Sequence, residues 1–283
     1  MGAPAPRPTP LQPYSAPSCR AGLSTIAVFV LAVALLSVAL SAIATPLFGL
    51  SWWKTLRRCV SISAVLSLWY TVRVVQRLPF RAYGFVPLRE GQRHVRFGLA
   101  VGAAALGVLC LLGLWSGLCR IDVTPDRARL WRTLLLFVPG ALLVSVVEEL
   151  VFRGMLLRNL LGCSRWFAVS ASSVAYALVH LREPAVTWLI WQELAGLTLF
   201  GVVLALSALR TRQLWLAIGL HAALAYGARV NKLVCTFPPD PAWSWFTGTS
   251  RLVNGVAGWI ALVVIGALVV WWTTSTQQRR VTG

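Results

Sequence analysis

The chain has 283 residues and a formal net charge of +18, and 58% of its residues are hydrophobic while only 12% are charged. Soluble domains are nearer half apolar and a quarter charged, so this composition excludes an ordinary water-soluble core and indicates a chain dissolved in lipid. The arginines form no single basic domain. They stand in short clusters between apolar runs, which is typical of membrane surfaces and argues against nucleic acid as a partner.

The N-terminal residues 1–21 are rich in Pro, Ala and Ser, without the compact apolar core of a cleaved signal peptide, and predict a disordered tail. Beyond them, apolar runs near spanning length recur along the chain. We expect membrane spans at residues 22–45, 59–76, 98–118, 131–151, 164–181, 186–208, 213–232 and 256–273. The fold class predicted by this pattern is an all-α, polytopic transmembrane helix bundle of about eight spans.

The flanks of these runs carry further information. Tryptophans stand at several ends, as in the aromatic belts of membrane proteins, and the stretch FPPDPAWSWF at residues 237–246 is too rich in proline to span and predicts an interfacial loop. Lys and Arg lean only slightly toward cytoplasmic termini, and we expect a multi-pass protein of a bacterial cell membrane. The six cysteines form no CxxC pair, so we interpret them as small apolar residues rather than a disulfide framework or a zinc ribbon.

Ionisable groups within the spans are functional candidates, because a charge at the centre of a spanning helix costs roughly 2.5–3.5 kcal/mol on insertion scales. The segment SVVEELVFRG, residues 145–154, carries the adjacent carboxylates Glu148 and Glu149. Glu149 lies four residues before Arg153, so the two share a helix face and can form an ion pair. Glu148 has no such local partner, which favours it as a base. The simpler interpretation is a helix end at which both glutamates reach water.

Two of the three histidines also fall on expected spans. His180 ends the apolar segment SSVAYALVHLREP, with Tyr176 one turn before it, and taken alone it is more typical of an interfacial residue. His221 lies inside the run LWLAIGLHAALAYG, where a histidine needs a polar partner. Water attack on a peptide carbonyl needs a base, a group that orients the water and a donor for the oxyanion. Glu148, His180 and His221 could supply these parts from three helices.

The order EExxxR, aromatic-xxx-His and a later His resembles the CAAX prenyl protease and bacteriocin-processing (CPBP) family of intramembrane proteases. Here the elements read Glu148-Glu149-Leu-Val-Phe-Arg153, Tyr176-Ala-Leu-Val-His180 and His221-Ala-Ala-Leu-Ala225. The resemblance covers residues 130–232 and, together with the hydropathy pattern, divides the chain into four parts. They are a disordered tail (1–21), N-terminal transmembrane helices with basic loops (22–129), a CPBP-like catalytic core (130–232), and an interfacial loop, last transmembrane helix and short tail (233–283).

The resemblance also implies roles for the site residues. Glu148 and His180 correspond to the pair that activates water, and His221 to the histidine on the oxyanion side; Glu149, Arg153 and Tyr176 are supporting residues.

One departure from the family pattern affects the oxyanion side. The family has an asparagine four residues after its last histidine, and that position is Ala225 here; the family's usual Phe is Tyr176. Tyr226, Asn231 or a backbone N–H could complete the oxyanion site.

The sequence allows two interpretations of the site, with a bound metal ion or without one. Two histidines and a carboxylate could bind zinc with a free position for water, which would make Glu148, His180 and His221 the ligands. The chain has no HExxH helix, and we expect a metal-free site with no cofactor. Glu193 lies in the expected span 186–208, where it either lines a cavity or anchors near the membrane interface.

Three functions fit these observations. The first is an intramembrane endopeptidase, a hydrolase that binds membrane lipid and a protein or peptide substrate. The second is a catalytically impaired CPBP-like protein that acts as an immunity or scaffold protein, which Ala225 favours. The third is a solute or proton-coupled transporter, which rests on intramembrane carboxylates alone and lacks paired repeats with broken helices.

Overall fold

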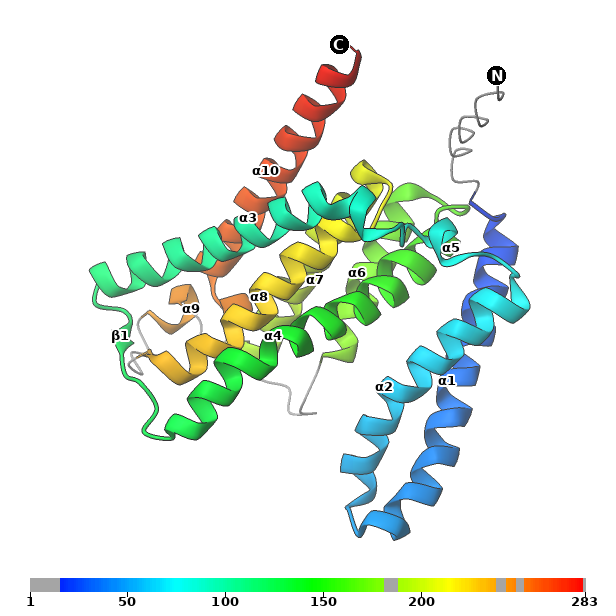
Figure 1. Cartoon of the computed structure of the whole chain (residues 1–283), viewed down its shortest axis with the longest axis horizontal. Helices are drawn as coiled ribbons and strands as arrows, with labels where there is room; N and C mark the ends of the chain where they lie inside the picture. The colour runs from blue at the N-terminus through cyan, green and yellow to red at the C-terminus, as the bar shows by residue number, and fades with distance from the viewer. Residues whose placement is uncertain (1–15, 181–187, 238–242, 248–251, 282–283) are drawn as a thin grey trace, which may run out of the picture.

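The computed structural model of the chain describes residues 16–180, 188–237, 243–247 and 252–281 (Figure 1). Almost all of these residues are helical. The elements are α1 (Cys19–Phe48), α2 (Trp52–Tyr70), η1 (Thr71–Val75), η2 (Phe80–Tyr83), α3 (Leu88–Trp115), β1 (Arg120–Ile121), α4 (Arg127–Glu149), η3 (Leu150–Leu157), α5 (Arg158–Leu160), α6 (Arg165–Val179), α7 (Trp188–Thr211), α8 (Trp215–Val234), β2 (Cys235–Thr236), α9 (Ser244–Thr247), η4 (Leu252–Asn254) and α10 (Val256–Val281).

The all-α polytopic architecture predicted from hydropathy is confirmed. Each of the eight expected spans coincides with a helix, and six helices in the described part of the chain are long and apolar enough to cross a membrane. The other two are α6, which has 15 residues, and α8, whose last turns carry Arg229, Asn231 and Lys232. Of the expected tail and interfacial loop, residues 1–15 and 238–242 lie outside the described residues.

The helices form a hairpin and a larger bundle (Figure 1). Helices α1 and α2 pack on each other, and the first turns of α1 pack on α5 of the bundle. Within the bundle, α8 is central, because it packs against α3 on one side and α4 on the other, while α7 packs on α6 and α10. A two-stranded antiparallel pair, β1 with β2, joins the loop after α3 to the end of α8.

Close contact between α3 and α8 depends on small residues. A Cβ added at Gly98 of α3 would collide with the backbone of Leu216 and Leu220, and one at Gly219 of α8 would collide with the carbonyl oxygen of Val95. Lipid provides no hydrophobic drive for two apolar helices to associate, so close backbone approach and dispersion contacts must hold them together. These glycines allow α8 to lie deep in the bundle.

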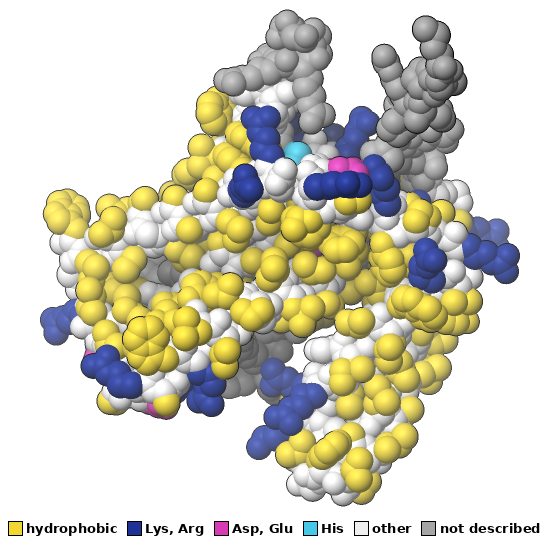
Figure 2. Space-filling model, in the orientation of Figure 1, with side chains coloured by type: hydrophobic (Ala, Val, Ile, Leu, Met, Phe, Trp, Pro, Cys, Tyr) yellow, Lys and Arg dark blue, Asp and Glu magenta, His cyan; other side chains and the backbone are white. Residues whose placement is uncertain are grey.

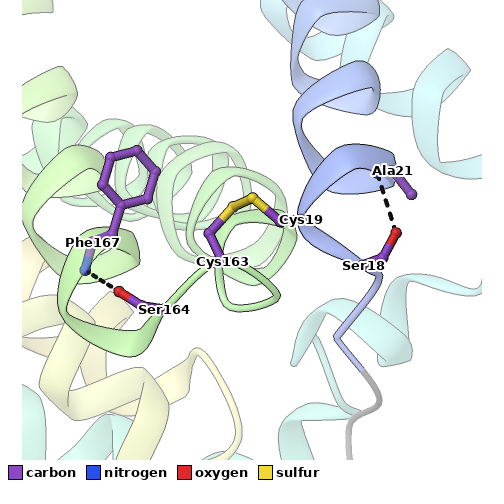
Figure 3. The surroundings of a disulfide bond; sticks show 6 residues. All are labelled: Ser18, Cys19, Ala21, Cys163, Ser164 and Phe167. Atoms are coloured by element: carbon purple, nitrogen blue, oxygen red, sulfur yellow. Dashed lines mark hydrogen bonds between the residues drawn. A yellow bond between two sulfur atoms is a disulfide. The ribbon is translucent and has the colours of Figure 1, made fainter.

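A disulfide corrects the prediction for two of the cysteines. Cys19 in the first turn of α1 is bonded to Cys163 in the loop after α5, 144 residues away (Figure 3). Ser18 and Ser164, the neighbours of these cysteines, cap the helices that follow them by accepting from the backbone N–H groups of Ala21 and Phe167. The bond therefore joins the start of the hairpin to the bundle, which the sequence separation of the two cysteines gave no reason to expect.

The other four cysteines are free thiols, as expected for small apolar residues. Three of them meet where α3, β1 and β2 come together, with the Cys110 and Cys235 sulfurs 3.9 Å apart. Burial raises the pKa of the Cys119 and Cys235 thiols, which lie outside the spanning helices, and this keeps them protonated near neutral pH.

The outer surface matches a protein dissolved in lipid. Figure 2 shows hydrophobic side chains over most of the visible face, with Lys and Arg side chains gathered at its edges. Many large aliphatic and aromatic side chains of the spanning helices are exposed, including Leu35, Leu111, Leu136 and Val263. Exposed apolar surface on this scale would aggregate in water, and it is the expected exterior for a helix bundle in a bilayer.

Candidate active site

The two adjacent glutamates lie at the junction between α4 and the π-helical segment η3 (Leu150–Leu157). Short π-helical segments inside α-helices are rare and occur often at functional sites, because the wider turn changes the direction of the side chains around it. Here the side chain of Glu149 is fully buried, whereas that of Glu148 is 24% exposed. One helix end thus places two carboxylates in different environments.

The predicted ion pair between Glu149 and Arg153 is present. Arg153 Nη1 donates to Glu149 Oε1 at 3.0 Å, and both side chains are fully buried. Arg153 Nη2 also donates to the carbonyl oxygen of Gly201 at 3.3 Å, and the guanidinium lies 4.6 Å from the centre of the Tyr176 ring. These contacts link η3 to α7 and α6, so the pair fixes the helices around the site relative to one another.

Each of the two histidines is held through its Nδ1 atom. His180 stands at the C-terminal end of α6, and its Nδ1 atom lies 2.8 Å from the backbone carbonyl oxygen of Tyr176. His221 stands in the middle of α8, and its Nδ1 atom lies 2.9 Å from Glu149 Oε1. A carbonyl or carboxylate oxygen only accepts hydrogen bonds, so both Nδ1 atoms carry a proton. Both Nε2 atoms are therefore left to face the rest of the site.

Glu148 lies between these two Nε2 atoms. Its Oε2 atom is 3.5 Å from His180 Nε2 and 3.6 Å from His221 Nε2. With neutral histidines, all three facing atoms are acceptors, so the centre of the site requires a donor such as water, or an added proton on one ring. The structure therefore brings Glu148, His180 and His221 together from α4, α6 and α8.

Tyr176 contributes a hydroxyl donor to this acceptor-rich site. The residue is only 2% exposed, and its hydroxyl lies 3.4 Å from His221 Nε2. Its ring packs edge-to-face on Phe152 and Phe200 and lies 4.4 Å from the centre of the His180 ring. The phenol is thus fixed by packing, with its hydroxyl beside Nε2 of His221.

A cavity of about 330 Å³ opens beside these groups. Its walls come from α3, α4, α6, α7, α8 and α10 and are mostly apolar, so two helices outside the segment that resembles the CPBP family complete the cavity. The cavity is lined by Glu148, Tyr176, His180 and His221. Glu193 lines it too, which is one of the two positions expected for this residue.

Arg229 and Lys232 also line the cavity, although sequence reasoning did not single them out. The helical period gave a signal for both, because positions 221, 225, 229 and 232 follow one face of α8. The two residues add cationic side chains to the cavity, about two to three helical turns beyond His221.

Ala225, where the family has asparagine, lines the cavity. Of the expected replacements, Tyr226 donates its hydroxyl to the carbonyl oxygen of Leu134 at 2.9 Å, and Asn231 lines a neighbouring cavity. Neither side chain is among those that line the cavity beside Glu148. The side-chain hydroxyl that the structure does place beside His221 is that of Tyr176.

Zinc does not fit the side chains as they stand. Within the described ranges, no group of three or more His, Cys, Asp or Glu side chains is placed to hold a metal ion. The chemistry proposed for the site therefore uses these side chains and water.

The fold and the site define a polytopic helical membrane protein with a glutamate–histidine cluster that lines a mostly apolar cavity. Residues 130–226 match the family model described as type II CAAX prenyl endopeptidase, Rce1-like. The match confirms the family resemblance that the three motifs predicted, and it includes Glu148, His180, His221 and Ala225. No curated protein matches the chain. The chain is therefore an integral membrane protein with a CAAX protease-like segment.

Proposed function

We propose that this protein is an intramembrane endopeptidase that hydrolyses a peptide bond in a membrane-associated or C-terminal segment of a protein substrate. The observation that carries the proposal is the position of Glu148 Oε2, 3.5 Å and 3.6 Å from the Nε2 atoms of two histidines on other helices. Buried ionisable groups that meet inside a membrane bundle are costly, and function is the usual reason for them. The match of residues 130–226 to an endopeptidase family supports the same reaction class.

Water activation is the role proposed for Glu148 and His180. A water between them would donate to the carboxylate and to the lone pair of His180 Nε2, which fixes its orientation. Its oxygen attacks the substrate carbonyl carbon as Glu148 accepts a proton. The same carboxyl then gives the proton to the leaving nitrogen as the peptide bond breaks, so the products are a carboxylic acid and an amine. The 24% exposure of the Glu148 side chain allows water to reach it.

Stabilisation of the oxyanion is the role proposed for His221 and Tyr176. When protonated, His221 donates through Nδ1 to Glu149 and through Nε2 toward the reacting carbonyl, and the Glu149 carboxylate balances its charge. The Tyr176 hydroxyl, 3.4 Å from that Nε2, is a second donor directed to the same place. Fixed donors aimed at developing negative charge account for a large part of catalysis by hydrolases. The Tyr176 hydroxyl thereby takes the place of the side-chain hydrogen-bond donor that the family has at the position of Ala225.

A peptide-binding protein without catalysis is the second candidate function. Ala225 favours it, because the family has an asparagine side-chain amide at this position and alanine has no side-chain donor. Such an immunity or scaffold protein would use the same cavity and would not need Glu148 to exchange protons. Its function would therefore survive the loss of the Glu148 carboxylate.

Cleavage by the purified full chain in proteoliposomes decides between them. Because the matching family is described as prenyl endopeptidases, the probes are a farnesylated CAAX peptide and an unprenylated single-span peptide, with products identified by mass spectrometry. We expect Glu148→Gln to lower the rate by about 10²–10⁴, the usual contribution of general acid–base catalysis. The matched control is Glu90→Gln, which removes a carboxylate paired with Arg81 on the surface and should leave the rate unchanged. Equal rates for wild type and Glu148→Gln would refute the proposal.

The expected location of the protein is a bacterial cell membrane, where lipid surrounds its spanning helices. The apolar exterior and the six candidate spans support an integral position in a bilayer. Membrane fractionation of the native host, followed by detection of the chain, tests the assignment to the cell membrane.

A further inference from the structure

Arg153 also lines a second cavity of the bundle. It has a volume of about 230 Å³ and is built by η2, η3, α5, the end of α7 and the turn between α7 and α8. None of Glu148, Tyr176, His180 and His221 lines it, so it is separate from the proposed active site. We call it the arginine cavity, after the three arginines Arg153, Arg158 and Arg212 that line it.

The arginine cavity is positively charged. Among the described residues that line it there is no aspartate or glutamate. Arg153 forms an ion pair with Glu149. The Arg158 guanidinium lies over the Tyr83 ring, 4.8 Å from its centre. Arg212 is exposed in the turn between α7 and α8. The lining of the arginine cavity therefore carries more positive than negative charge.

Some buried polar atoms on its lining residues have hydrogen-bonding capacity to spare. Within the described part of the chain, Arg153 Nε has no hydrogen-bond acceptor and Gln213 Oε1 has no donor. Buried polar atoms without partners are uncommon in folded proteins and often mark a missing water, ion or ligand. A ligand that satisfies both atoms must offer an acceptor oxygen to arginine and a hydroxyl to glutamine.

The place of the cavity in the bundle indicates the source of such a ligand. Helix α7 ends at Thr211 and α8 begins at Trp215, so the turn that carries Arg212 and Gln213 lies at an end of these bundle helices. Helix ends in a bilayer lie at the level of the lipid headgroups, and basic pockets between helices at that depth bind phosphate-bearing headgroups. Guanidinium groups match phosphate oxygens in shape as well as in charge.

We propose that the arginine cavity is a binding site for a phosphate group, supplied by a phospholipid headgroup that also carries hydroxyl groups. The phosphate oxygens accept from Arg153 Nε, Arg158 and Arg212, and a headgroup hydroxyl donates to Gln213 Oε1. Binding involves no covalent step. It does not depend on the proposed peptidase activity, because none of the groups that would act on a peptide bond takes part.

The test measures binding to the detergent-purified full chain by the shift in its unfolding temperature. The probes are dihexanoyl phosphatidylglycerol, dihexanoyl phosphatidylcholine and inorganic phosphate. Phosphatidylcholine has the same phosphodiester but a quaternary amine that offsets its charge and no hydroxyl donor. We expect a saturable rise with phosphatidylglycerol at concentrations at least about tenfold below those that phosphatidylcholine needs, since one charge-assisted hydrogen bond accounts for about a factor of ten.

Variants then locate the site. Arg212→Gln changes an exposed residue and should leave the fold intact while it weakens phosphatidylglycerol binding about tenfold, and Arg158→Gln should weaken it further. The matched control is Arg129→Gln with Arg132→Gln, which removes two exposed charges near the N-terminal end of α4 and should leave binding unchanged. A saturable shift with inorganic phosphate alone, lost in Arg212→Gln, would support the phosphate site and identify a free anion as the ligand. No saturable shift with any probe, or equal affinity in wild type and Arg212→Gln, would overturn the proposal.

Discussion

The hydroxyl of Tyr176 is the most specific feature of the proposed mechanism, and Tyr176→Phe removes it alone. The ring keeps its contacts with Phe152, Phe200 and the Arg153 guanidinium, because these involve the ring and not the hydroxyl. The lost contact is one hydrogen bond to His221 Nε2 at 3.4 Å, so we expect the free energy of unfolding to fall by about 0.5–1.5 kcal/mol. The loss of an oxyanion donor, in contrast, lowers kcat by about 10²–10³.

The assay is single-turnover cleavage in proteoliposomes, with thermal unfolding measured on the same preparations. The matched control is Tyr226→Phe, which also removes one tyrosine hydroxyl, here part-buried, but breaks a bond to the Leu134 carbonyl oxygen outside the cavity. It should lose similar stability and keep the wild-type rate. Ala225→Asn in the Tyr176→Phe background should restore part of the rate, since it returns an amide donor to the cavity. A Tyr176→Phe rate within about threefold of wild type would refute a role for this hydroxyl in the chemistry.

Three further predictions address the scaffold and the cofactor. Glu149→Gln leaves the Arg153 guanidinium buried without its counter-charge and should destabilise the fold by about 3–5 kcal/mol, whereas the double change with Arg153→Met should recover much of that loss in thermal unfolding. Gly219→Ala pushes α8 against the Val95 carbonyl oxygen and should cost about 1–3 kcal/mol, while Gly107→Ala, with open space at its Cβ, should be neutral or slightly stabilising. A metal chelator should leave the cleavage rate unchanged, and an activity that is lost with chelator and restored by zinc would contradict the expected metal-free site.

Hydropathy and helical period predicted most of the fold, because both act along a single stretch of chain. The eight expected runs are helices, and the Glu149–Arg153 pair follows from a four-residue separation on one turn. The partner of His221 was not local. Its Nδ1 meets Glu149, 72 residues earlier, and no pattern along the chain states that α4 and α8 are neighbours. The family resemblance provided that information.

The features that sequence reasoning missed are those that depend on packing between distant segments. The Cys19–Cys163 bond needs α1 to lie beside the loop after α5, and the contribution of α3 and α10 to the cavity needs their place around α8. The π-helical segment after Glu149 has no composition that sets it apart from an α-helix. The arginine cavity likewise arises from three stretches of chain, residues 83–84, 153–161 and 208–214, that only the folded bundle brings together.

The disulfide of Cys19 with Cys163 has a consequence for the motion of the α1–α2 hairpin. The chain itself already joins the α1–α2 hairpin to the bundle once, because α2 continues through η1 and η2 into α3. The disulfide adds a second covalent link, at the start of α1. With one link the hairpin could turn about a single point, whereas two links leave only rotation about the line that joins them. Because packing between apolar helices is weak in lipid, the second link restricts the orientation of the hairpin beside the bundle more firmly than packing alone.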